Sequence, residues 1–137
     1  MNKNLRGLRL AAAPAAIAAA LLVATAAPAS ASVHDGYLEQ YEMGLYYLVD
    51  RGGCVFDYNN DDDTFTDNKF YGPAGCHGRT DWVNDNTESY WNRDVFGWNV
   101  YTDWNYGGIK GSIPIGHIGN ASSNFKNKIS SSRFYVQ

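Results

Sequence analysis

Cysteine is scarce in this chain, which has only Cys54 and Cys76 among its 137 residues. No C-x-x-C spacing occurs, and of the histidines only His77 is close in sequence to either thiol, so we do not expect a zinc site. Both cysteines lie in the part of the chain that we expect to be exported, where paired cysteines usually oxidise. The sequence therefore predicts a Cys54–Cys76 disulfide, which on the chain-entropy model stabilises the fold by about 3 kcal/mol.

Basic residues are also few. The chain has 11 Lys and Arg against 14 Asp and Glu, which gives a formal net charge of −3. Lys3, Arg6 and Arg9 lie in an N-terminal segment that we expect to be removed, so the remaining chain is more acidic still. Because phosphate contacts depend on Lys and Arg, we expect neither nucleic acid nor anionic lipid as a partner.

Recognisable catalytic motifs are absent from the sequence. It contains neither H-E-x-x-H nor G-x-S-x-G, and its three histidines are scattered along the chain. Since no nucleophile, base and metal-ligand set stands at a familiar spacing, we do not expect an enzyme.

One acidic run, from Asp57 to Asp63, resembles an EF-hand loop in its alternating oxygen-bearing side chains. The glycine that such a loop requires at position six is replaced by Asp62, and the bidentate glutamate at position twelve by Asn68. We therefore reject an EF-hand. A solvated acidic loop is the expected structure, and weak calcium binding is the alternative.

The first 31 residues have the features of a secretory signal peptide. A basic start is followed by an alanine-rich apolar run over 10–27 and by the small-x-small sequence of residues 29–31. Pro14 and this cleavage site argue against a permanent membrane anchor. We expect residues 1–31 to be removed and residues 32–137 to form one secreted, monomeric domain without membrane attachment.

The composition of the remaining chain predicts an all-β fold. It is rich in aromatic residues and glycine, and short apolar segments alternate with clusters of Gly, Asn and Asp. The expected strands are 45–49, 54–58, 96–101, one or two within 109–118, and 132–136. Residues 37–48 also fit one face of a helix. We expect the tryptophans to pack in the core rather than to stack on sugars.

A polar six-residue phrase occurs twice, as NDNTES at 84–89 and as KNKISS at 126–131. Repetition at this distance suggests one domain made of two similar halves.

A second pattern joins an aromatic residue, Tyr101, to Gly108 across six residues. With the repeated phrases, it resembles the Greek-key signature of the βγ-crystallins. There the aromatic side chain packs over a folded hairpin, and the glycine takes a conformation that a Cβ opposes. The resemblance implies a two-Greek-key β-sandwich. The first half shows no clean copy, because Phe56 is followed seven residues later by Asp63.

From about Gly36 to its end, the chain resembles the secreted bacterial peptidase inhibitors of this fold, which include small metalloproteinase inhibitors. Members often have two disulfides, whereas this chain can form one. The resemblance implies inhibition of an extracellular metallopeptidase by a rigid loop. Our first candidate for that loop is the disulfide-tethered stretch Gly75, Cys76, His77, Gly78 and Arg79. The Cys54–Val55 bond is a second candidate, ranked lower because Val55 is expected in a buried strand.

The βγ-crystallin resemblance also implies a calcium site, although no cofactor is required. In calcium-binding members two such phrases cooperate, and the fifth residue contributes a hydroxyl. The corresponding ligands here are Asn84, Asp85, Glu88, Asn127 and Ser130. Lys126 stands where Asn or Asp is usual, and its ammonium repels Ca²⁺, so we expect at most one weak site.

Two alternatives to these functions remain open. The phrases can be purely structural, with Ser89 and Ser131 bonded to the folded hairpins and the Asn and Asp residues shaping turns. The whole chain can be a non-inhibitory module, stabilised by calcium, or a small secreted toxin or antimicrobial protein. Its acidic charge disfavours direct attack on a membrane.

Overall fold

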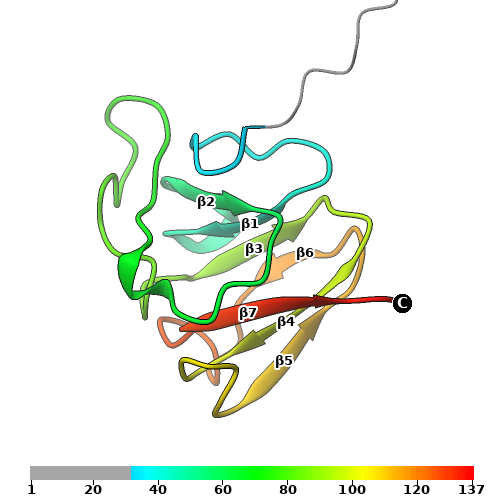
Figure 1. Ribbon diagram of the computed structural model, residues 1–137. Helices are drawn as coiled ribbons and strands as arrows, with labels where there is room; N and C mark the ends of the chain where they lie inside the picture. The colour runs from blue at the N-terminus through cyan, green and yellow to red at the C-terminus, as the bar shows by residue number, and fades with distance from the viewer. Residues whose placement is uncertain (1–31) are drawn as a thin grey trace, which may run out of the picture.

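The computed structural model describes residues 32–137, so the expected signal peptide lies outside the described residues. Two antiparallel sheets pack against each other, as Figure 1 shows. The larger sheet has the strand order β2-β1-β3-β6 and the smaller one β5-β4-β7. This confirms the predicted all-β architecture. Within residues 32–137, no helix has the length and apolar character needed to cross a membrane.

The strands are short. In chain order they are β1 (Met43–Tyr46), β2 (Val55–Tyr58), β3 (Ser89–Asn92), β4 (Gly97–Tyr101), β5 (Lys110–Ile113), β6 (Ile118–Asn120) and β7 (Ser131–Tyr135). Two 3-10 turns, η1 (Val49–Arg51) and η2 (Phe65–Asp67), lie between them.

Each half of the chain contributes to the sheet of the other half. Strand β6 comes from the second half, but it pairs with β3 and so extends the sheet of the first half. In return, Asp62 of the first half forms a β-bridge with Ser132 of β7. Each sheet is therefore built from both halves, as two interlocked Greek keys require.

Most of the expected strands agree with the structure to within a few residues. The stretch 109–118 divides at Pro114 into β5 and β6, because proline cannot donate to a sheet ladder. The helical alternative for 37–48 is wrong. Met43 and Leu45 of β1 are both buried in the core, and this spacing of two residues is the side-chain period of a strand. Strand β3 was not expected, because its sequence lacks a clear apolar alternation.

Aromatic side chains dominate the core between the sheets. The Tyr58 ring meets the Trp98 ring edge to face, with centroids 4.8 Å apart, and thereby joins the two sheets. Trp98 is fully buried as expected, but Trp82 is 50% exposed and Trp104 is 68% exposed. The expectation of core packing was wrong for these two because they lie in a loop and at a hairpin tip, where no sheet face covers them.

The acidic run is less solvated than predicted at its start. Asp57 is fully buried in β2, and its carboxylate accepts hydrogen bonds from the backbone N–H groups of Asp35 and Gly36 at 3.1 and 2.9 Å. The expectation of a solvated loop was therefore wrong for Asp57. It fails because the segment that covers this carboxylate comes from 21 and 22 residues earlier in the chain.

Candidate functional site

The hairpin between β4 and β5 is folded over and fixed by a serine from β7. The Ser131 hydroxyl donates to the carbonyl oxygen of Asp103 at 2.6 Å and accepts from the backbone N–H of Tyr106 at 3.1 Å. The Tyr101 and Tyr106 rings meet edge to face, 5.8 Å apart. Gly108 has φ +73°, and a Cβ there would overlap the Thr102 hydroxyl. The aromatic and glycine roles implied by the signature are thus present.

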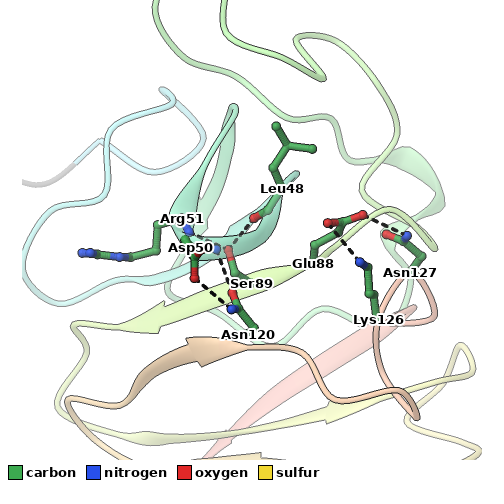
Figure 2. A network of polar contacts seen from close by, with 8 residues as sticks. All are labelled: Leu48, Asp50, Arg51, Glu88, Ser89, Asn120, Lys126 and Asn127. Carbon is green, nitrogen blue, oxygen red and sulfur yellow. Dashed lines mark hydrogen bonds and ion pairs between the residues drawn. The ribbon is translucent and has the colours of Figure 1, made fainter.

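The first half contains an equivalent hairpin that sequence reasoning missed. The Ser89 hydroxyl donates to the carbonyl oxygen of Leu48 at 2.6 Å and accepts from the backbone N–H of Arg51 at 2.9 Å (Figure 2). Gly53 has φ +73°, like Gly108. The signal was available in the sequence, because Tyr46 is followed by six residues and Gly53.

The two repeated phrases lie side by side and bond to each other symmetrically. The backbone N–H of Asp85 donates to the carbonyl oxygen of Ile129 at 3.1 Å, and that of Asn127 donates to Thr87 at 2.9 Å. Asp85 and Asn127 both have left-handed backbones, with φ of 59° and 55°. An approximate two-fold axis therefore relates the phrases and gathers the predicted ligands into two places.

The first place, here called the first site, comprises Asn84, Asp85 and Ser130. The Ser130 hydroxyl donates to Asp85 Oδ1 at 3.2 Å, and the Asn84 amide donates to Asp85 Oδ2 at 2.8 Å. Oxygens that share one Ca²⁺ at about 2.3–2.6 Å each lie roughly 3 Å apart. The Asp85 carboxylate and the Ser130 hydroxyl therefore fit a hard cation, and the Asn84 side chain can turn its own oxygen inward. A single carboxylate implies weak binding.

The second place, here called the second site, comprises Glu88, Lys126 and Asn127. Figure 2 shows the Lys126 ammonium and the Asn127 amide pointing at the Glu88 carboxylate. The Lys126 Nζ lies 3.4 Å from Glu88 Oε2, and the Asn127 amide nitrogen lies 3.3 Å from Glu88 Oε1. Two of the five predicted ligands thus belong to a place that already contains a positive charge.

The tethered loop follows residue 71 and projects beyond the sheets between η2 and β3 (Figure 1). The predicted disulfide joins Cys54 to Cys76. The backbone N–H of Cys54 donates to the carbonyl oxygen of His77 at 2.9 Å, and the Arg79 side chain donates to Gly72 at 3.3 Å. The base of the loop is therefore fixed to β2.

The loop folds as a series of tight turns. Gly75 and Gly78 have φ of +85° and +80°, and Thr80 has φ +69° although it is not glycine. A Cβ at Gly78 would overlap the Tyr47 ring, whereas one at Gly75 would meet nothing within 4 Å. Of the predicted loop residues, Gly75, His77 and Arg79 are exposed, and Cys76 and Gly78 are partly buried.

The alternative inhibitory bond is not accessible. Cys54 is 1% exposed and Val55 is 5% exposed. Val55 pairs with Tyr46 of β1 on one side and bonds Tyr71 on the other, at 2.9 and 3.0 Å. A peptidase could reach the Cys54–Val55 bond only after β2 left the sheet, as the expected burial of Val55 suggested.

The titratable side chains of the described part of the chain are characterised by their grouping around possible metal sites and by their shifted pKa values. Within residues 32–137, no group of three or more His, Cys, Asp and Glu side chains is placed to hold a metal ion. Burial raises the pKa of the Tyr46 phenol above its ordinary value, which keeps this side chain neutral on β1.

Comparison with known proteins shows the fold. No protein-family model matches the sequence, and no curated protein matches it. Solved βγ-crystallin structures do match. One, from work on the evolution of the eye lens βγ-crystallin domain fold, has 16% identity and a TM-score of 0.58 and covers 75% of this chain and 93% of its own. A βγ-crystallin from an archaeon has 26% identity and a TM-score of 0.52 and covers 71% of this chain and 100% of its own.

A βγ-crystallin from Ciona intestinalis also matches, with 19% identity and a TM-score of 0.53. It covers 69% of this chain and 99% of its own. The single βγ-crystallin-like β-sandwich expected from the sequence is thus confirmed.

Proposed function

We propose that this chain is a secreted inhibitor that presents loop 72–81 to an extracellular peptidase. The observation that supports the proposal is the combination of a projecting loop and a fixed base. The Cys54–Cys76 disulfide and the hydrogen bond from Cys54 to His77 hold the base against β2. The side chains of His77 and Arg79 are exposed on this loop.

A loop of this kind is already ordered in the free protein, so binding does not have to order it. Each rotamer-rich side chain immobilised on binding costs about 0.5–1.5 kcal/mol, and loop ordering adds to that cost. A loop already fixed in the free protein avoids much of the second cost. The resemblance to metalloproteinase inhibitors makes a thermolysin-like metallopeptidase the first target to test.

The test is a titration of residues 32–137 against a thermolysin-like metallopeptidase, with a trypsin-like serine peptidase in parallel. We expect stoichiometric inhibition that is lost on reduction of the disulfide and weakened at least tenfold by His77→Ala combined with Arg79→Ala. Trp104→Ala is the matched control, because Trp104 is exposed at a different hairpin tip. Failure of the folded protein to inhibit either peptidase at micromolar concentration would overturn the proposal.

A second candidate function, a calcium-stabilised module, is favoured by the first site. Asp85 Oδ1 and the Ser130 hydroxyl lie 3.2 Å apart with the Asn84 side chain beside them. Bound there, Ca²⁺ would link the two repeated phrases and hence the two halves. At tenfold excess over its Kd it would stabilise the fold by about 1.4 kcal/mol.

Thermal unfolding with millimolar CaCl₂ tests this candidate. We expect a rise in Tm for the unaltered chain and no rise for Asp85→Asn with Ser130→Ala. Magnesium chloride at equal ionic strength is the control for screening. An unchanged Tm at 10 mM CaCl₂ would count against calcium and would leave the inhibitor proposal intact.

A further inference from the structure

The first and second sites occupy equivalent positions in the two halves of the domain. Lys126 corresponds to Asn84, Asn127 to Asp85 and Ser130 to Glu88, each pair being 42 positions apart in the sequence. The reciprocal backbone hydrogen bonds of Asp85 and Asn127, and their matching φ values, support this correspondence. Any difference between the sites therefore comes from side chains alone.

The side chains give the two sites different charges, because Asp85 is the only charged group of the first site whereas Lys126 neutralises Glu88 in the second. The first site directs a carboxylate and a hydroxyl toward a common point. In the second site, both oxygens of Glu88 accept from nitrogen donors, the Lys126 ammonium at 3.4 Å and the Asn127 amide at 3.3 Å. A divalent cation there would have to displace the ammonium from Glu88 and then remain beside it.

We infer that Lys126 is a built-in cation that takes the place of a divalent ion in the second site. Its ammonium is attached to the chain, so the contact with Glu88 forms without any ligand from solution. Within residues 32–137, Lys126–Glu88 is the one ion pair found. It joins the last turn before β7 to the residue before β3, which is the link that a cation would make in the first site.

This inference has one consequence for the number of bound ions, which rests on the calcium candidate above, and one for the effect of chelators and salt. The domain takes up one divalent cation, in the first site, rather than two. The link across the second site persists in the presence of a chelator, and high salt weakens it, because exposed ion pairs are screened. The side-chain link in the second site is thus independent of metal, whereas the one in the first site depends on it.

The experiment opens the second site by substitution. Lys126→Asn removes the ammonium, and Lys126→Asn with Asn127→Asp and Glu88→Ser reproduces the ligand set of the first site. Lys128→Asn is the matched control, since it removes the same charge two positions away, where Nζ bonds only the carbonyl oxygen of Ser123 at 3.3 Å. CaCl₂ titrations followed by ¹H–¹⁵N NMR locate binding at residues 84, 85 and 130, which form the first site, or at residues 88, 126 and 127, which form the second. Melting in EDTA gives a readout without metal.

Lys126→Asn is expected to lower the Tm in EDTA by a few degrees more than Lys128→Asn does, with a smaller difference at 1 M NaCl. The triple variant is expected to bind a Ca²⁺ ion in the second site that the unaltered chain does not bind. If the first site binds nothing, only the calcium candidate falls, and the melting comparison in EDTA decides the inference. The inference is overturned if the unaltered chain fills both sites, or if the first site binds Ca²⁺ and the folded triple variant gains no second ion. It is also overturned if Lys126→Asn and Lys128→Asn melt alike in EDTA.

Discussion

The hydroxyl of Ser131 lies 2.6 Å from the carbonyl oxygen of Asp103, to which it donates a hydrogen bond. The same hydroxyl accepts from the backbone N–H of Tyr106, so one buried atom holds the two sides of a folded hairpin. Ser89 repeats this arrangement in the first half. These two serines connect the repeated phrases to the hairpins.

Ser131→Ala is expected to lower the free energy of unfolding by about 1–3 kcal/mol, because it leaves a backbone donor and acceptor without a partner. Ser89→Ala is expected to have a similar effect. Urea unfolding followed by tryptophan fluorescence measures the change, with exposed Ser123→Ala as control. A loss below about 0.5 kcal/mol at both positions would show that water replaces the hydroxyl.

Replacing both cysteines by alanine is expected to destabilise the fold by about 3 kcal/mol, since it removes the constraint on the unfolded chain. Urea unfolding of this variant should match that of the unaltered protein in reductant. Limited proteolysis should then cut within 72–81. If the loop resists proteolysis after reduction, its hydrogen bonds alone fix it, and the disulfide is not what orders it.

Gly78→Ala is expected to destabilise the protein more than Gly75→Ala. Both glycines have positive φ, so each substitution carries a conformational cost of about 1–2 kcal/mol. Only at Gly78 would the added Cβ also overlap the Tyr47 ring. The difference between the two variants in chemical denaturation therefore reports the contact between loop and Tyr47. Equal losses would mean that the loop moves away without cost.

Glu42→Gln is expected to raise the Tm at pH 7. Glu42 is fully buried, and its Oε1 has no hydrogen-bond partner. Burial raises its pKa above the ordinary value, and the nearby Asp57 carboxylate contributes to the same shift. A raised folded-state pKa gives stability that is present below the unfolded pKa and lost as pH rises through the folded pKa.

The gain from Glu42→Gln should therefore shrink as pH falls toward 4, where the glutamate is protonated and carries no charge to bury. Melting temperatures measured from pH 4 to pH 8 follow this, with exposed Glu39→Gln as control. A substitution that destabilises equally at all pH values would show that the Glu42 carboxylate is solvated or paired in solution.

Sequence reasoning recovered the features that are written in local patterns. The strand around Trp98 and Val100 follows from their alternation, and the second hairpin follows from Tyr101 and Gly108. The first half carries the same spacing in Tyr46 and Gly53, so the absence of a clean copy, which was argued from Phe56 and Asp63, is wrong.

Other features depend on contacts between distant parts of the chain. Asp57 is buried because the backbone at 35–36 covers it. Lys126 and Glu88 are 38 positions apart in the sequence. They pair because the two repeated phrases meet across an approximate two-fold axis. No local pattern indicates which acidic side chain a lysine will meet, so the sequence did not predict Glu88 as the partner of Lys126.

Strand β6 and the Asp62–Ser132 bridge cross between the halves, so each half is incomplete alone. A chain cut between β3 and β4 would leave β3 without β6, and β7 without the bridge from Asp62. Each fragment would expose an unpaired strand edge, which is a template for association with another chain. Two such fragments mixed together should recombine as a noncovalent pair. The intact protein should unfold in a single step, because neither half remains folded when the other unfolds.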